Sequence, residues 1–140
     1  MPKKEITIES EEALCDFARA IAQNSNSGDI YLLQGDLGAG KSTFSRAFIR
    51  YLSGSDIDVP SPTFTLVQQY DTDKGLIWHF DLYRLEDSDE IYEIGWEEAL
   101  SDGILLVEWP ERLGALVLPQ AKSLKIEITG DETRKITYKE

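Results

Sequence analysis

The chain contains a glycine-rich segment that has the spacing of a phosphate-binding loop (P-loop). The segment fits the pattern G-x-x-x-x-G-K-S/T with one additional internal glycine, and it reads Gly35-Asp36-Leu37-Gly38-Ala39-Gly40-Lys41-Ser42. Glycines permit positive φ angles and a close backbone approach, so successive N–H groups surround a phosphate, and the following helix adds the positive end of its dipole. Lys41 is then the point charge for the β- and γ-phosphates, and the Ser42 hydroxyl is a Mg²⁺ ligand. The segment predicts a site for a nucleotide with Mg²⁺, and the other residues expected at the nucleotide are Asp36, Gly38, Ala39, Gly40 and Thr43.

A P-loop also needs an acid that holds Mg²⁺ directly or through water, usually at the end of a neighbouring apolar strand. Glu108 follows four apolar residues, 104–107, and Asp81 follows the stretch 76–80. We assign Glu108 to Mg²⁺, and Asp81 to the orientation of water or to an outer contact with the metal. If the P-loop is left out of consideration, other interpretations fit these acids. Asp81 could be an acid at a strand end that pairs with Arg84, and Glu108 could cap a helix or be solvated.

Three further features lie close to these groups. The segment 61–65 has hydroxyls, Thr63 among them, that suit a sensor of the γ-phosphate, although it fits a proline-stiffened turn before a strand equally well. Strand alternation puts His79 on the same face as Asp81, either as a histidine of the core or as a group beside the phosphates. Tryptophans are more often packing anchors than ligand platforms, but Trp109 directly follows the expected metal ligand and so lies close to the site.

An alternation of strands and helices must position these residues. The apolar spacing predicts a helix capped by Ser10, a second over 41–52 that Gly54 ends, and an acidic helix over 86–102. The expected strands are 4–8, 30–33, a hairpin of 66–70 with 76–80, 104–107, 124–129 and 135–138. This order predicts a single α/β domain over residues 1–140, a P-loop NTPase-like sandwich with a central mixed β-sheet flanked by helices.

The charge of the chain limits its partners. The sequence has 14 Lys and Arg against 26 Asp and Glu, a net charge of -12, so it repels phosphate backbones and is not expected to bind RNA or DNA unaided. Residues 86–102 contain eight acids and no base. They predict either a solvated helix face or a docking surface for a basic partner.

The rest of the composition excludes several classes of protein. One cysteine, Cys15, cannot form an internal disulfide, and with one histidine it cannot supply a four-ligand zinc site. We expect Cys15 to be a small buried hydrophobe in the first helix. No stretch approaches the roughly 20 apolar residues that cross a bilayer, and the first residues do not resemble a signal peptide. We therefore expect a soluble, cytoplasmic protein without membrane contact.

Four motifs, in order along the chain, resemble those of the TsaE (YjeE) family: GDLGAGKST (35–43), SPTFTLV (61–67), HFDLYRL (79–85) and VEWP (107–110). Members of this family are small bacterial P-loop ATPases needed to make threonylcarbamoyladenosine in tRNA. The resemblance implies that the chain binds ATP and Mg²⁺ and acts with the proteins TsaD and TsaB. Its ATP/ADP cycle would reset their complex between rounds. TsaD would perform the carbamoyl transfer, and the chain would meet tRNA only through the complex.

The resemblance also implies roles for single residues. These are phosphate contact for Lys41, Mg²⁺ binding for Ser42 and Glu108, a place in a switch-like loop for Thr63, and a hydrolysis-linked acid in Asp81. In the family the nucleotide base lies near the start of the first helix, which is here around Ser10 and Glu11. Ser42 stands where the family usually has threonine, a change that retains the hydroxyl.

Other functions fit the residues less well. A small-molecule kinase needs a lid that supplies arginines, and the chain has six arginines and no arginine-rich segment. A GTP-binding switch needs the sequence Asn-Lys-x-Asp to bind guanine, and that sequence does not occur. A nucleotide-sensing module without turnover would have the same residues as an ATPase that is slow alone and stimulated by partners.

Overall fold

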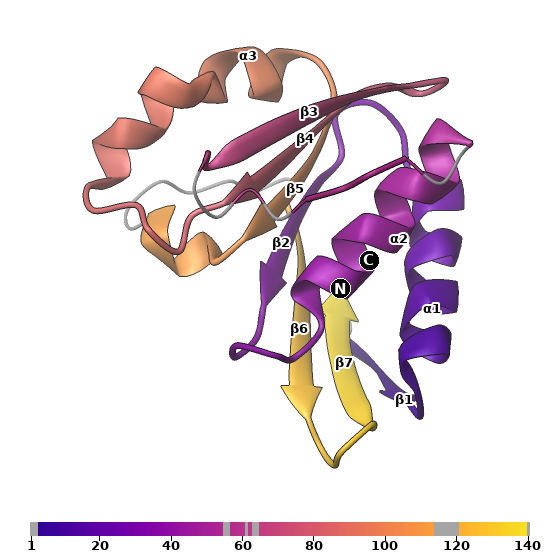
Figure 1. Cartoon of the computed structure of the whole chain (residues 1–140). Coiled ribbons are helices and arrows are strands. Elements are labelled where there is room, and N and C mark those ends of the chain that lie inside the picture. Colours follow the sequence, from indigo (N-terminus) through magenta and orange to yellow (C-terminus); the bar gives the residue numbers. More distant parts are fainter. Residues whose placement is uncertain (1–2, 55–56, 61, 63–64, 114–120, 140) are drawn as a thin grey trace.

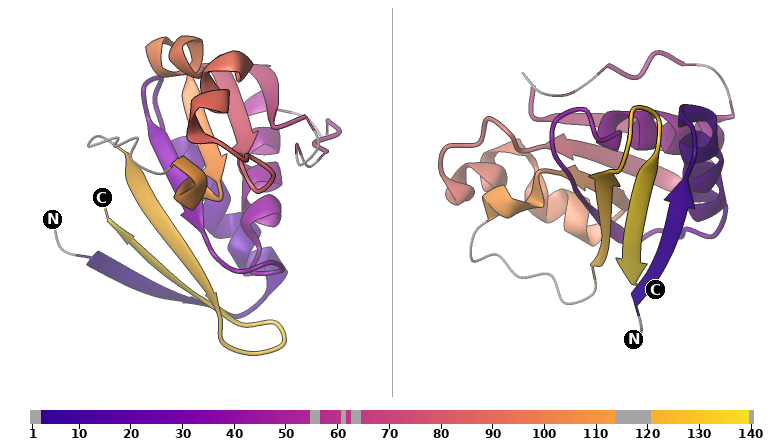
Figure 2. Two further views of the ribbon diagram at one scale, coloured as in Figure 1. Left: turned by 90° about the vertical axis from the view of Figure 1, so that its left-hand side faces the viewer. Right: turned by 90° about the horizontal axis from the view of Figure 1, so that it is seen from below.

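One β-sheet runs through the molecule and carries helices on both faces (Figure 1, Figure 2). The computed structural model describes residues 3–54, 57–60, 62, 65–113 and 121–139. In this part of the chain the strands follow the spatial order β1-β7-β6-β2-β5-β4-β3. Their bounds are β1 Lys3–Ile8, β2 Ile30–Gln34, β3 Val67–Thr72, β4 Gly75–Asp81, β5 Ile104–Glu108, β6 Lys122–Ile128 and β7 Arg134–Lys139.

The central strands are parallel and the edge strands are antiparallel. β2 pairs in parallel with β5 and β6, and β4 pairs in parallel with β5. The antiparallel pairs are β3 with β4, β6 with β7, and β7 with β1. The expected α/β sandwich with a central mixed sheet is therefore confirmed. The carboxyl ends of β2, β4 and β5 meet at one edge, which is where ligands bind in open α/β sheets.

Two long helices, α1 (Glu11–Gln23) and α2 (Lys41–Ser53), pack against each other on one face of the sheet (Figure 1). Ser10 caps α1 as expected, because its Oγ accepts a hydrogen bond from the N–H of Ala13 at 3.1 Å. Gly54 ends α2 in the left-handed conformation, with φ of 74°. None of the helices in the described residues has both the length and the apolar character needed to span a membrane.

Strand alternation divides the core into two parts. In β4, Trp78 and Phe80 belong to the core on the face opposite α1 and α2, where the rings of Phe80 and Trp96 meet edge to face with centroids 5.1 Å apart. His79 and Asp81 point to the face that α2 covers, as the alternation predicts.

The expectation of one acidic helix over 86–102 is wrong. The chain instead forms a 3-10 helix, η1 (Ser88–Ile94), and a short helix, α3 (Trp96–Ser101), followed after β5 by a second 3-10 helix, η2 (Pro110–Leu113). Gly95 separates η1 from α3 with φ of 89°, and a Cβ there would lie 3.0 Å from the Trp78 ring. The break therefore lets the segment pack closely on β4, and its buried residues are Ile91, Trp96 and Ala99.

Candidate functional site

The P-loop joins β2 to α2 through backbone conformations that favour glycine. Gly38 and Gly40 have φ of 82° and 118°. The loop is also tightly packed, because a Cβ at Gly40 would lie 2.6 Å from Cδ2 of Leu14 and one at Gly35 would lie 2.7 Å from the carbonyl oxygen of Ile126 on β6. Side chains at Gly35 and Gly40 would therefore force the loop away from its neighbours.

Lys41 is the first residue of α2, and its ammonium group lies inside the site. The residue is 5% exposed, and Nζ donates to the carbonyl oxygen of Gly35 at 2.5 Å. Nζ also lies 3.3 Å from the centre of the Trp109 ring, a favourable contact for a desolvated cation. Burial lowers the pKa of Lys41, and the nearby carboxylates, led by Glu108, oppose this shift. The positive charge thus lies at the P-loop among acids.

Glu108 ends β5 as a buried carboxylate that is 1% exposed. Its Oε1 accepts from Ser42 Oγ at 3.2 Å, and its Oε2 accepts from Ser45 Oγ at 3.4 Å and from His79 Nε2 at 2.5 Å. A buried carboxylate is tolerated only when such partners are present. His79 is therefore both a buried residue and a part of the site, because it holds Glu108. Its Nδ1 has no hydrogen-bond partner among the described residues.

Asp81 ends β4 and lies in register with Glu108 across the parallel strand pair. It is 4% exposed, and its Oδ1 accepts from the backbone N–H of Tyr83 at 3.1 Å. The parallel pairing of β4 and β5 therefore brings two carboxylates to the start of the P-loop helix.

A cavity of about 230 Å³ joins the loop to the strand ends. Its lining combines loop backbone, the start of α2 and the two acids, and it includes Gly38, Gly40, Lys41, Ser42, Thr43, Asp81, Glu108 and Trp109. Most residues that the sequence assigns to the site are thus brought together. The side chain of Asp36 is exposed, and its carbonyl oxygen accepts from the N–H of Ala39 at 3.0 Å within the loop.

A second cavity, of about 320 Å³, shares Gly38, Gly40 and Thr43 with the first. The start of α1 contributes Ser10 and Glu11 to its lining, and the loop contributes Ala39. Glu11 and Ala39 therefore line this second cavity, whereas Asp81 and Glu108 line the first. Thr63, with Ser61 and Phe64, lies outside the described residues.

Two residues at the site were not found by sequence reasoning. Arg134 on β7 donates from Nε to the carbonyl oxygen of Ala39 at 2.9 Å and from Nη2 to that of Gly38 at 3.3 Å, so it fastens the loop. Nothing near Arg134 in the sequence indicates this contact. Ser45 is three residues after Ser42, so the helical period could have predicted that both meet the same acid.

The oxygen donors suit a Mg²⁺-bound nucleotide. A hydroxyl and carboxylates are the ligands that hard divalent cations prefer. Across the described residues, no three His, Cys, Asp or Glu side chains converge as a complete metal site. A cation here would therefore need phosphate oxygens and water as further ligands, which is the usual manner of Mg²⁺ binding.

Comparison with known proteins gives a consistent result. The model of a family described as "Threonylcarbamoyl adenosine biosynthesis protein TsaE" matches residues 8–136. Relatives of this chain carry the name tRNA threonylcarbamoyladenosine biosynthesis protein TsaE. The protein from Rickettsia typhi is 41% identical, over 95% of this chain and 92% of its own length. The protein from Aquifex aeolicus is 42% identical, over 95% of this chain and 93% of its own length. The protein of that name from Bacillus subtilis is 35% identical over 94% of this chain and 82% of its own. The crystal structure of YdiB from Bacillus subtilis is similar with a TM-score of 0.76 and 29% identity, covering 98% of this chain and 84% of that one.

Proposed function

The chain belongs to the TsaE family of threonylcarbamoyladenosine biosynthesis proteins, and we propose that it is a P-loop ATPase that hydrolyses Mg-ATP in support of this tRNA modification. The observation that carries the proposal is the convergence of Lys41 and Ser42 with two buried carboxylates, Asp81 and Glu108, on one cavity. A protein that only bound phosphate would gain nothing from buried acids beside its lysine.

Each residue has a distinct role in this proposal. Lys41 and the N–H groups of the P-loop bind the β- and γ-phosphates and stabilise the charge that develops during transfer. Ser42 and Glu108 would hold Mg²⁺, which would supply positive charge next to the phosphates. Asp81 orients the attacking water, and Trp109 keeps bulk water from Lys41.

His79 and Ser45 act through Glu108. Both donate to Oε2, so Oε1, which contacts Ser42, is the oxygen of Glu108 that would be available to a metal. Groups that hold a metal ligand fix its orientation and raise metal affinity, commonly by 10- to 100-fold.

The cavity lined by Glu11 and Ala39 is the proposed site for the nucleotide base, because it shares loop glycines with the phosphate site. Thr43 and Arg134 also line it. Thr63 and the remainder of 61–65 are proposed to respond to the γ-phosphate, as the motif resemblance implies.

TsaD and TsaB are the proposed partners. As the resemblance to the TsaE family implies, carbamoyl transfer is assigned to TsaD, and this chain is assigned the hydrolysis of ATP. The net charge of -12 opposes direct binding to tRNA, so tRNA would be reached through the partner complex.

The test is phosphate release from Mg-ATP with and without purified TsaB and TsaD. We expect slow release alone, stimulation by the two proteins together, and none above background for Lys41→Ala. Lys125→Ala is the matched control, because Lys125 is exposed on β6. Its neighbours Leu124 and Ile126 point to the face that α1 and α2 cover, so Lys125 points away from that face. Nucleotide binding without hydrolysis under all conditions would replace the ATPase with a nucleotide-sensing module.

Thermal unfolding tests nucleotide choice independently. Mg-ATP and Mg-ADP at about 100 times their dissociation constants should each stabilise the fold by about 2.7 kcal/mol, or several degrees of Tm, and GTP should do so less. Equal shifts with GTP and ATP would contradict the assignment as an ATPase.

A further inference from the structure

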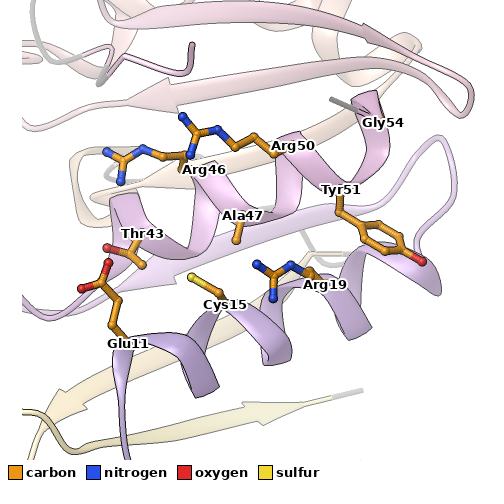
Figure 3. Close-up of a pocket in the computed structure, with 9 residues that line it drawn as sticks. All are labelled: Glu11, Cys15, Arg19, Thr43, Arg46, Ala47, Arg50, Tyr51 and Gly54. Carbon is orange, nitrogen blue, oxygen red and sulfur yellow. The ribbon is translucent and has the colours of Figure 1, made fainter. Parts of the chain in front are cut away.

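A groove of about 500 Å³ separates the exposed sides of α1 and α2 (Figure 3). Arg19 from α1 and Arg46 and Arg50 from α2 line it, and Cys15 and Ala47 lie between the arginines of the two helices. The groove is lined by none of the buried acids of the nucleotide site. Half of the six arginines in the sequence therefore surround one groove of a strongly acidic protein.

The lining of this groove has a net positive charge, because three arginines stand against one acid, Glu11, which lies at the end of the groove near Thr43. α2 contains three basic residues and no acid. Among the residues that the structure describes, the Arg46 guanidinium makes no ion pair or hydrogen bond, and Arg50 uses only Nε, to the carbonyl oxygen of Ile57 at 3.0 Å. Arg19 pairs with Asp16 at 2.7 Å, but both side chains are largely exposed, so this pair is weak.

Arg50 lies in the last turn of α2, where a cation complements the helix dipole, but Arg46 lies outside that turn and gains nothing from the dipole. They are four residues apart on α2, where two like charges destabilise a helix slightly. Their terminal N–H groups form planar donor sets that match carboxylates in a bidentate manner. Such donors, aligned along an open groove, fit an acidic ligand.

We propose that this groove binds an extended acidic segment of a protein partner, with two of its carboxylates paired to Arg46 and Arg50. The two arginines are separated by about 6 Å along the helix axis, at 1.5 Å per residue. Alternate side chains of an extended peptide point the same way and are separated by about 6.6 Å. The matching pattern is therefore acid-x-acid.

The dimensions of the groove also fit such a segment. Its lining on α2 extends from Thr43 to Gly54, about 16 Å, which accommodates roughly five extended residues. Tyr51 lies at one end and offers an aromatic surface to an apolar neighbour of the acids.

Nucleic acid fits the groove less well. A nucleic-acid strand continues beyond the groove with a negative charge at every nucleotide, and the net charge of -12 opposes its approach, whereas the peptide needs to bring only two charges. Glu11, Glu12 and Asp16 are exposed on α1 and would repel phosphates that lie outside the groove.

The test is fluorescence anisotropy with the labelled peptide Gly-Glu-Leu-Glu-Gly at low salt, measured without nucleotide. We expect it to bind at least tenfold more tightly than Gly-Gln-Leu-Gln-Gly. The double variant Arg46→Gln, Arg50→Gln should lose at least tenfold in affinity. Lys125→Gln removes the same kind of charge from the other face and should change affinity less than twofold. Because glutamine keeps much of the aliphatic stem, unchanged circular dichroism and Tm are expected for the variants.

The location of the peptide can be checked through Cys15, the single cysteine of the chain. Burial raises the pKa of its thiol, so alkylation with iodoacetamide is measured at alkaline pH. The Glu peptide should slow alkylation, and the Gln peptide should not.

Equal affinity for the Glu and Gln peptides, or no loss in the arginine double variant, would overturn the proposal. Tighter, arginine-dependent binding of a hexauridylate would also overturn it, in favour of a nucleic-acid groove. Because the assay contains no ATP or ADP, either result leaves the ATPase proposal intact, and failure of ATP hydrolysis leaves this proposal intact.

Discussion

Replacing each strand-end carboxylate by its amide distinguishes the two proposed acids. Glu108→Gln should raise the Mg²⁺ concentration needed for tight ATP binding, because a neutral amide is a poorer ligand for a hard cation. Asp81→Asn should leave ATP and Mg²⁺ binding within a few fold. It should instead reduce partner-stimulated hydrolysis by about 100-fold or more, the scale of a positioned acid or base.

The structure determines which way the side-chain amide introduced by Glu108→Gln must point. In the native protein Oε2 accepts from His79 Nε2 and Ser45, whereas Oε1 has only Ser42, whose hydroxyl can also accept a hydrogen bond. An NH₂ group facing His79 Nε2 would either oppose two donors or require the other imidazole tautomer, which places an N–H at Nδ1, where it has no partner among the described residues. Either arrangement leaves a buried donor unsatisfied, at a cost of about 1–3 kcal/mol. The NH₂ group therefore takes the Oε1 position.

This orientation turns a donor toward the proposed metal and removes the negative charge as well. Loss of a group that only holds a metal ligand typically lowers metal affinity by 10- to 100-fold. Because Glu108 is itself the proposed ligand, we expect Glu108→Gln to lower Mg²⁺ affinity by at least about 100-fold, or about 2.7 kcal/mol. In Asp81→Asn, the amide carbonyl can still accept from the Tyr83 N–H.

The assay titrates each variant with ATP at several Mg²⁺ concentrations and measures phosphate release with TsaB and TsaD present. Unfolding by urea serves as the control for folding. If Asp81→Asn shifts the Mg²⁺ requirement and Glu108→Gln does not, the two roles are exchanged and β4 carries the metal ligand.

Three further predictions follow from individual contacts. Lys41→Ala should abolish hydrolysis and weaken ATP binding, because the ammonium group stabilises the phosphates in ground and transition states; unchanged turnover would contradict the P-loop assignment. Gly35→Ala should lower the free energy of unfolding in urea by about 2–3 kcal/mol, because its Cβ would lie 2.7 Å from the backbone of β6. Gly38→Ala is the control, because a Cβ there meets no atom within 4 Å apart from its chain neighbours. It should show only the cost of its positive φ angle, about 1–2 kcal/mol. Burial raises the pKa of Tyr31 to about 12, so Tyr31 ionises at lower pH in the unfolded state than in the folded state. The free energy of unfolding should therefore fall by up to about 2.7 kcal/mol as pH rises from 10 to 12. Tyr31→Phe should lack this loss, and parallel curves of unfolding free energy against pH for the two proteins would refute the prediction.

Local pattern was sufficient for the centre of the site. The P-loop glycines and Lys41 form one continuous motif, and Asp81 and Glu108 each follow an apolar strand. Parallel strands end at the same edge of a sheet, so these local patterns also predict that the two acids meet. The register of β4 and β5 confirms that meeting.

Contacts that depend on the global order of strands could not be predicted. Arg134 reaches the P-loop because β7 pairs with β6 and not with β2, and nothing near Arg134 encodes that order. The acidic segment 86–102 has apolar residues at helical spacing, but Gly95 breaks it so that Trp96 can pack on Phe80. Here tertiary packing overrides the local period.

The charge balance of the phosphate cavity favours a metal-bound nucleotide over a free one. The charged residues that line it are Lys41, Asp81 and Glu108, with formal charges of +1, -1 and -1, so their sum is -1. At about 4 Å and an effective dielectric constant of 20, each added like-charge pair costs about 4 kcal/mol, and a free triphosphate would add several. A divalent cation would change the net charge of the cavity from -1 to +1, and the two acids are the side chains that would attract it. On the proposed function, the two acids would repel ATP alone and would make the site selective for ATP that arrives with its metal.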